Sequence, residues 1–140
     1  MSCPFCDALS EGSIVENALA AAVADRFPTN PGHTLVVPKR HVRSWFETTP
    51  EERTALLELV DQVKQWAERE LLPAGYNIGI NDGPAAGQTV MHLHIHVIPR
   101  FDGDVDDPAG GVRFVIPERG NYRRPGFIPR VQKAGDDAGE

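Results

Sequence analysis

Three histidines alternate with apolar residues between His92 and Ile98, where the sequence reads HLHIHVI. In a β-strand, residues two apart share a face and lie roughly 6.5–7 Å apart, so one face would carry only imidazoles. A solvent-facing strand that happens to hold histidines is the simplest alternative, but the chain has only 5 histidines. Neutral imidazole offers a nucleophilic ring nitrogen, and its attack on phosphorus would give a covalent phosphoramidate intermediate.

The loop before these histidines suits phosphate chemistry. Gly83 and Gly87 allow the backbone to approach a ligand closely, and Gln88 and Thr89 supply side-chain donors. The loop lacks the Gly-Lys-Ser/Thr of an ATP/Mg²⁺ phosphate cradle. Alone it would be an ordinary turn, but its position next to the histidines favours a phosphate contact.

Cys3 and Cys6 form a Cys-x-x-Cys pair in a chain with no visible signal peptide. We therefore expect a cytoplasmic protein in which the pair is a metal half-site or a redox pair rather than a structural disulfide. Two free thiols are the remaining alternative. We expect no helix directly after the cysteines, and a redox pair would then lack the helix that lowers a thiol pKa.

Composition excludes several classes of protein. The chain has 140 residues and a formal net charge of −6, which argues against a polynucleotide-binding surface. Its longest apolar run, Ala18 to Ala24, is too short to cross a membrane. We predict a core domain over residues 1–100 and a Gly/Pro- and charge-rich, partly disordered extension over 101–140, where only Val112 to Ile116 could form a strand.

The elements that must position the histidines can be read from periodicity. A helix is predicted between Thr49 and Leu72, with Thr49 as N-cap and Pro73 and Gly75 as stop signals. Its apolar stripe contains Leu56, Leu59, Val60, Val63, Trp66 and Ala67. Strands are predicted at 32–38, 76–80 and 91–98. A long helix among such strands indicates an α+β fold with a mostly antiparallel sheet.

Two segments together resemble a known family. Residues 87–100, GQTVMHLHIHVIPR, resemble the signature of the histidine triad (HIT) superfamily of nucleotide hydrolases and transferases, and residues 30–41, NPGHTLVVPKRH, resemble its second block. The resemblance covers roughly residues 3–100. The Asp82-Gly83-Pro84 turn and the intact Gln88-Thr89 favour the fragile-histidine-triad and bacterial diadenosine-polyphosphate hydrolase branches. The resemblance implies a HIT-like fold whose sheet continues across a homodimer.

The resemblance also implies residue roles. His94 corresponds to the nucleophile that attacks the α-phosphate, His96 to the residue that contacts phosphate oxygens and assists the leaving group, and His92 to the residue that orients the nucleophile. His33 corresponds to the fourth histidine of the set. The matching nucleotide contacts are Phe5 and Val23 for the base, Asp25 for the ribose, and Asn81, Gly87, Gln88 and Thr89 for the phosphates.

Some members of the superfamily bind structural zinc, which implies a ligand set here of Cys3, Cys6, His41 and His92. Two thiolates and two imidazoles suit tetrahedral zinc. The free thiols and the redox pair stay open as alternatives.

The implied activity is hydrolysis of nucleoside phosphoanhydrides at the α-phosphate through a nucleotidyl-histidine. The best substrate is a diadenosine tetra- or triphosphate, with AMP as product and Mg²⁺ accompanying the polyphosphate. A nucleoside phosphoramidase or nucleotidyl transferase would use the same histidines. Two alternatives of other classes are a non-catalytic, zinc-stabilised nucleotide-binding module and a redox module that uses the cysteines.

Overall fold

A computed structural model describes residues 3–129 of the chain. The chain divides into two compact units, Met1–Val105 and Asp106–Glu140.

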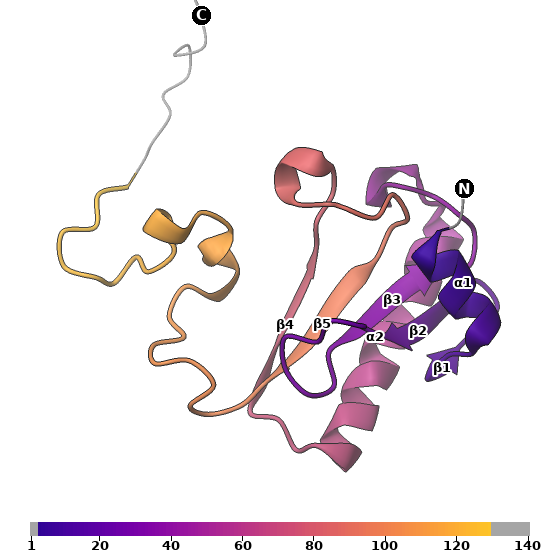
Figure 1. Cartoon of the computed structure of the whole chain (residues 1–140), viewed down its shortest axis with the longest axis horizontal. Helices are drawn as coiled ribbons and strands as arrows, with labels where there is room; N and C mark the ends of the chain where they lie inside the picture. Colours follow the sequence, from indigo (N-terminus) through magenta and orange to yellow (C-terminus); the bar gives the residue numbers. More distant parts are fainter. Residues whose placement is uncertain (1–2, 130–140) are drawn as a thin grey trace, which may run out of the picture. The chain divides into compact units, whose positions relative to one another are not determined.

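The first unit is built on one five-stranded antiparallel sheet (Figure 1). The strand order is β1-β2-β3-β5-β4, so β3 and β5 lie inside the sheet and β4 is an edge. The strands are β1 (Val15–Glu16), β2 (Ala20–Ala24), β3 (Thr34–Pro38), β4 (Gly75–Ile80) and β5 (Ile95–Arg100). With its helices, this sheet confirms the predicted α+β class with a mostly antiparallel sheet.

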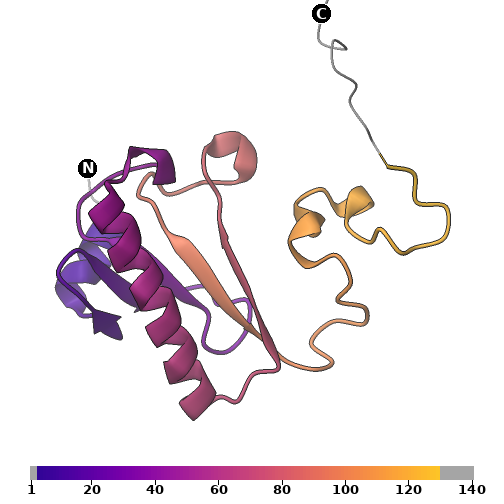
Figure 2. The same ribbon diagram turned by 180° about the vertical axis from the view of Figure 1, so that it is seen from behind.

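One long helix, α2 (Pro50–Glu70), lies along one face of the sheet (Figure 2). The predicted capping box forms, because the Thr49 hydroxyl accepts from the Glu52 N–H while the Glu52 carboxylate accepts from the Thr49 N–H. The residues that α2 buries are Glu52, Ala55, Leu56, Leu59, Val63 and Ala67. Val60 and Trp66 are only half-buried, so the buried stripe is turned slightly from the predicted one.

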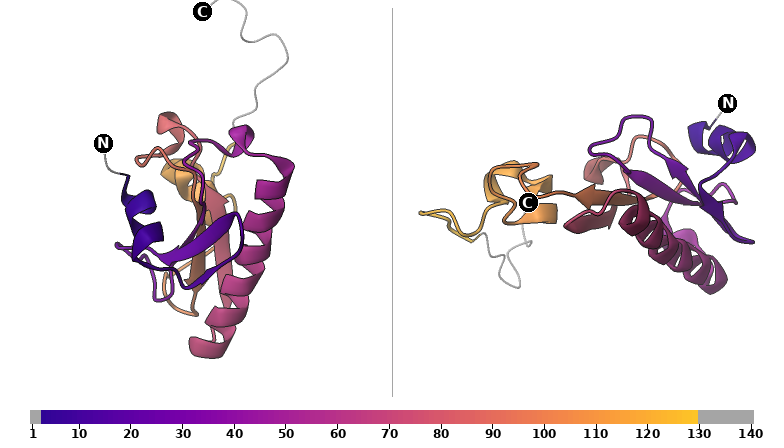
Figure 3. Two further views of the ribbon diagram at one scale, coloured as in Figure 1. Left: turned by 90° about the vertical axis from the view of Figure 1, so that its right-hand side faces the viewer. Right: turned by 90° about the horizontal axis from the view of Figure 1, so that it is seen from below.

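The opposite face of the sheet is covered near β2 and β3 by a short helix, α1 (Pro4–Glu11), as Figure 3 shows. Val23, Leu35 and Val37 form a second apolar cluster against Phe5, Ala8 and Leu9 of this helix. The expectation of no helix after the cysteines is therefore wrong. Its start was visible in Pro4, because proline is favoured in the first turn of a helix.

Strand β2 has the sequence AAAVA, which carries little intrinsic strand propensity. It forms because both neighbouring strands pair with it: Glu16 lies opposite Ala21, and Val36 lies opposite Ala22. Burial on both faces then favours small side chains, and Ala20, Ala21 and Ala22 are all fully buried. Tertiary packing thus overrides local propensity.

The strand predicted at 91–98 begins later, at Ile95. Pro38 has no N–H to donate, and the Nε2–H of His92 donates to the Pro38 carbonyl over 2.8 Å. The ladder between β3 and β5 therefore ends at the pair Val36 and Ile95. His92 lies in a bend and His94 in irregular chain that leads into the strand. The alternation persists, because Leu93, Ile95 and Val97 are all buried in the core.

In the second unit, the segment predicted as a strand forms a turn of 3-10 helix, Gly111–Val115. Gly110 and Gly111 both have positive φ, and the Arg113 guanidinium donates to the carbonyls of Arg119 and Gly120. These bonds close the segment on itself. The domain boundary at residue 100 and the disorder of part of the extension stay predictions. No helix in the described part of the chain is long and apolar enough to span a membrane.

Candidate active site

His94 is held by the main chain. Its Nδ1–H donates to the carbonyl of His92 over 2.8 Å, which leaves Nε2 without a proton in the neutral ring. His94 is 8% exposed and lines a cavity. The edge of its ring packs on Phe5 of α1, with the ring centroids 4.7 Å apart. The imidazole is therefore fixed in one tautomer, with one ring nitrogen available to attack a ligand.

A chain of hydrogen bonds runs through the two other histidines of the site. The Thr29 backbone N–H donates to His33 Nδ1 over 3.0 Å, so the proton of neutral His33 lies on Nε2. That Nε2–H faces His96 Nδ1 at 2.9 Å. His96 must then carry its own proton on Nε2. One backbone amide thus sets the tautomer of both rings.

His96 Nε2 is buried and has no hydrogen-bond partner among the described residues. An unpaired buried donor costs about 1–3 kcal/mol, so its presence beside a cavity indicates a ligand atom that accepts from it. Burial, aided by His94 and His33, lowers the pKa of His96 to about 4. Burial also lowers the pKa of His33. Both rings are therefore neutral near pH 7.

The cavity has a volume of about 500 Å³, within the range of small-molecule pockets. The histidines on its wall are His33, His94 and His96. The predicted nucleotide contacts that line it are Phe5, Val23, Asp25, Asn81, Gly87 and Thr89. These residues come from α1, β2 and the loops after β2 and β4, so the fold brings distant parts of the sequence to one site.

Asp25 directly follows β2 and lies beside His33 and His96. One carboxylate oxygen lies 3.4 Å from His33 Nε2, and the other accepts from the Phe27 N–H over 2.8 Å. Arg26 and Phe27 also line the cavity and were missed from the sequence. Their position directly after Asp25 was the available signal, since a loop that presents Asp25 also presents its neighbours.

Gln88 is the one predicted nucleotide contact that does not line the cavity. It is 4% exposed, and its side-chain amide is hydrogen-bonded to the main chain. Its Oε1 accepts from the Gly83 N–H at 2.8 Å, and its Nε2 donates to the carbonyls of Arg43 and Val90 at 2.9 and 3.1 Å. These bonds hold the loop that carries Asn81, Gly87 and Thr89.

The four predicted metal ligands, Cys3, Cys6, His41 and His92, do gather at one point. His92 Nδ1 lies 3.5 Å from each Sγ and 3.1 Å from His41 Nδ1, and His41 Nδ1 lies 3.4 Å from Cys6 Sγ. Tetrahedral zinc with bonds of about 2.0–2.3 Å separates its ligand atoms by about 3.3–3.8 Å. The donor set fits zinc, and each of these four distances lies within about 0.2 Å of that range.

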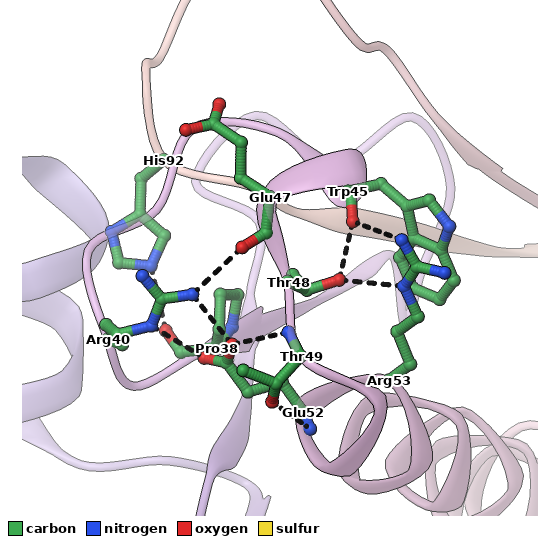
Figure 4. Close-up of polar contacts among 9 residues, drawn as sticks. All are labelled: Pro38, Arg40, Trp45, Glu47, Thr48, Thr49, Glu52, Arg53 and His92. Atoms are coloured by element: carbon green, nitrogen blue, oxygen red, sulfur yellow. Dashed lines mark hydrogen bonds and ion pairs between the residues drawn. The ribbon is translucent and has the colours of Figure 1, made fainter.

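Hydrogen bonds to neighbouring groups orient two of these residues, His92 and His41. Because His92 Nε2–H donates to Pro38, its Nδ1 is free to bind a metal. The segment that carries His41 is fastened to α2 by Arg40, whose Nε and Nη2 lie 3.1 and 2.7 Å from the Glu52 carboxylate (Figure 4). Burial raises the pKa of the Cys6 thiol, with further contributions from Cys3 and Asp7, which does not favour a reactive redox thiol.

Comparison with known proteins identifies the family. The model of the HIT domain matches residues 9–103. The uncharacterized HIT-like protein MG132 of Mycoplasma genitalium is 40% identical over 106 residues, covering 72% of this chain and 74% of that protein. The asymmetrical bis(5'-nucleosyl)-tetraphosphatase of Schizosaccharomyces pombe is 44% identical over 89 residues, covering 64% of this chain and 49% of that protein.

A solved structure is also similar. A zinc-bound histidine triad family protein from Mycobacterium smegmatis superposes with a TM-score of 0.67 at 36% identity, covering 82% of this chain and 91% of that one. The family match, these relatives and the histidine geometry agree. The chain therefore belongs to the HIT family of nucleotide hydrolases and transferases.

Proposed function

We propose that the protein hydrolyses nucleoside phosphoanhydrides at the α-phosphate, with a diadenosine tetra- or triphosphate as substrate and AMP as product. The observation that carries this proposal is a pair of nitrogens on two histidines that line one cavity: His94 Nε2, which carries no proton in the neutral ring, and His96 Nε2, a buried donor without a partner among the described residues. A nucleophile beside a donor is what displacement at phosphorus requires.

In the first step the lone pair of His94 Nε2 attacks the α-phosphorus and forms an N–P bond. The P–O bond to the leaving nucleotide breaks, and its electron pair moves to the bridging oxygen. His96 Nε2–H donates to that oxygen. His96 keeps its proton, because the nucleotide leaves as an ionised phosphate, and the hydrogen bond from His33 Nε2–H to His96 Nδ1 at 2.9 Å holds the ring in place.

The positive charge on the nucleotidylated His94 ring lies close to the His92 carbonyl, which accepts its Nδ1–H. In the second step water attacks the phosphorus, the N–P bond breaks and its electron pair returns to Nε2. The water proton passes to solvent as the water oxygen becomes part of AMP. AMP leaves, and the three histidines are again in their starting state.

Within the same proposal, Cys3, Cys6, His41 and His92 hold a structural zinc. Its role is to tie the start of α1 to the chain that enters β5. The zinc named in the M. smegmatis relative supports this assignment. We further propose a cytoplasmic homodimer whose sheets join into one, a boundary of the HIT domain near residue 100, and Mg²⁺ that travels with the polyphosphate.

The test uses the purified full chain and its His94→Asn variant. Each is incubated with diadenosine tetraphosphate and, in parallel, with adenosine phosphoramidate, and rapidly quenched in base for intact-protein mass measurement. We expect AMP release and a transient AMP adduct with the wild type, and neither with His94→Asn. Faster turnover of the phosphoramidate would favour the phosphoramidase alternative, and turnover only with a second acceptor would favour a transferase. Nucleotide binding without an adduct or a product would overturn the proposed enzymatic activity and favour the nucleotide-binding module.

A further inference from the structure

The turn from Thr29 to His33 determines which ring nitrogens of His33 and His96 carry protons, because Thr29 supplies the N–H that His33 accepts. The turn is closed by a bond from the His33 N–H to the Asn30 carbonyl at 3.2 Å. It is packed tightly against β5, since a Cβ on Gly32 would lie 3.1 Å from the Pro99 side chain and would clash with Leu71. Gly32 has φ +83°, which suits glycine.

Asn30 fastens this turn to the end of β5. Its Nδ2 donates to the Pro99 carbonyl at 3.0 Å and to the Asp104 carboxylate at 2.8 Å. Pro99 lies three residues after His96 on the same strand. One side-chain amide therefore links the segment that holds His33 to the strand that holds His96.

Asp104 is itself held in place from several sides. Its carboxylate accepts from Arg100 Nε at 2.8 Å and Arg100 Nη2 at 2.7 Å, and from the Phe101 N–H at 3.0 Å. Arg100 also donates to the Asn77 side chain on β4 at 2.7 Å. These contacts hold the pKa of Asp104 well below its usual range. Asn30 thus binds an ionised group with little freedom to move.

We propose that Asn30, anchored by Asp104, is a positioning residue that places the Thr29 N–H and so keeps His33 and His96 in the tautomer with the proton on Nε2. The kinetic consequence rests on the proposed function, whereas the tautomer can be measured without turnover. Asn30 is not among the described residues that line the cavity. Its loss should therefore lower kcat and leave KM nearly unchanged, since small misplacements of catalytic groups can cost up to about 100-fold in rate.

Asn17 provides a matched control. Its Nδ2 donates to the Ala55 carbonyl at 2.9 Å, and its Oδ1 accepts from the N–H groups of Leu19 and Ala20. It likewise ties a turn to another element, but at the end of β2 away from Asp25. Asn17→Ala should lower stability by a comparable amount and leave the hydrogen bonds of His33 and His96 unchanged.

The experiment compares Asn30→Ala, Asn17→Ala and wild type in two ways. Steady-state hydrolysis of diadenosine tetraphosphate gives kcat and KM, and ¹⁵N spectra of histidine-labelled protein at pH 8 report which ring nitrogens carry protons. For Asn30→Ala we expect kcat at least about 10-fold below that of Asn17→Ala, KM within about two-fold of wild type, and mixed tautomers at His33 and His96. Asn17→Ala should keep both tautomers.

Unchanged tautomers in Asn30→Ala, or a kcat equal to that of Asn17→Ala, would overturn the inference. If Asn30→Ala does not fold, Asp104→Asn is judged by the same criteria with a smaller expected loss, because it keeps an oxygen that faces Asn30 but removes the charge held by Arg100. If wild type does not cleave diadenosine tetraphosphate, the proposed function fails, and the ¹⁵N spectra alone decide the role of Asn30.

Discussion

Replacing Gln88 distinguishes a residue that touches substrate from one that holds the loop. Gln88→Ala removes three buried hydrogen bonds, to Gly83, Arg43 and Val90. Each bond contributes about 1 kcal/mol net to the free energy of unfolding, and its loss costs more where the partner group stays buried without a new hydrogen bond. The sum is about 3 kcal/mol, which for a unit of this size lowers Tm by about 10–20 °C.

Thermal unfolding followed by circular dichroism, together with steady-state hydrolysis of diadenosine tetraphosphate, checks this prediction. Thr89→Ala is the control, because Thr89 is the exposed neighbour of Gln88 and lines the cavity. It should leave Tm nearly unchanged and raise KM. A Gln88→Ala variant with the Tm of wild type and a raised KM would refute the reasoning and make Gln88 a direct ligand contact.

Three further outcomes are expected. Cys6→Ser should remove the zinc measured by elemental analysis, about one ion per chain in wild type, and lower Tm; equal zinc in both proteins would contradict the assigned ligands. Because the pKa of His96 is about 4 when folded and about 6.5 when unfolded, its contribution to stability is complete above pH 6.5 and falls by about 3 kcal/mol towards pH 4, as urea titrations across that range would measure; equal stability at both ends would contradict it. Glu52→Gln should weaken the pair between the buried Glu52 carboxylate and the exposed Arg40 guanidinium and lower the midpoint of the same titration, with an unchanged midpoint as the contrary result.

The sequence predicted the elements whose signals are local. Thr49 and Pro50 mark the start of the long helix because caps and first-turn prolines act on their own backbone. The alternation around His94 and His96 survives although the strand begins only at Ile95, because Leu93, Ile95 and Val97 are all buried in the core.

What the sequence could not show depends on partners far along the chain. Strand β2 exists because its alanines are buried between two strands, and nothing in AAAVA says so. Gln88 looks like a donor for phosphate until Gly83 and Arg43 are found beside its amide. Asn30 meets Asp104 across 74 positions, a contact that no local pattern encodes.

The bond from His94 to the carbonyl of His92 has a consequence for how this site can vary. Every amino acid carries a carbonyl, so the orientation of His94, the proposed nucleophile, does not depend on which side chain occupies position 92. That position is therefore free to serve the cysteine cluster through its ring while its main chain serves the reaction. The proposed metal binding and the proposed orientation of the nucleophile are therefore separable: a related chain without Cys3, Cys6 and His41 could place another residue at 92 and still hold the histidine at 94 by the same bond.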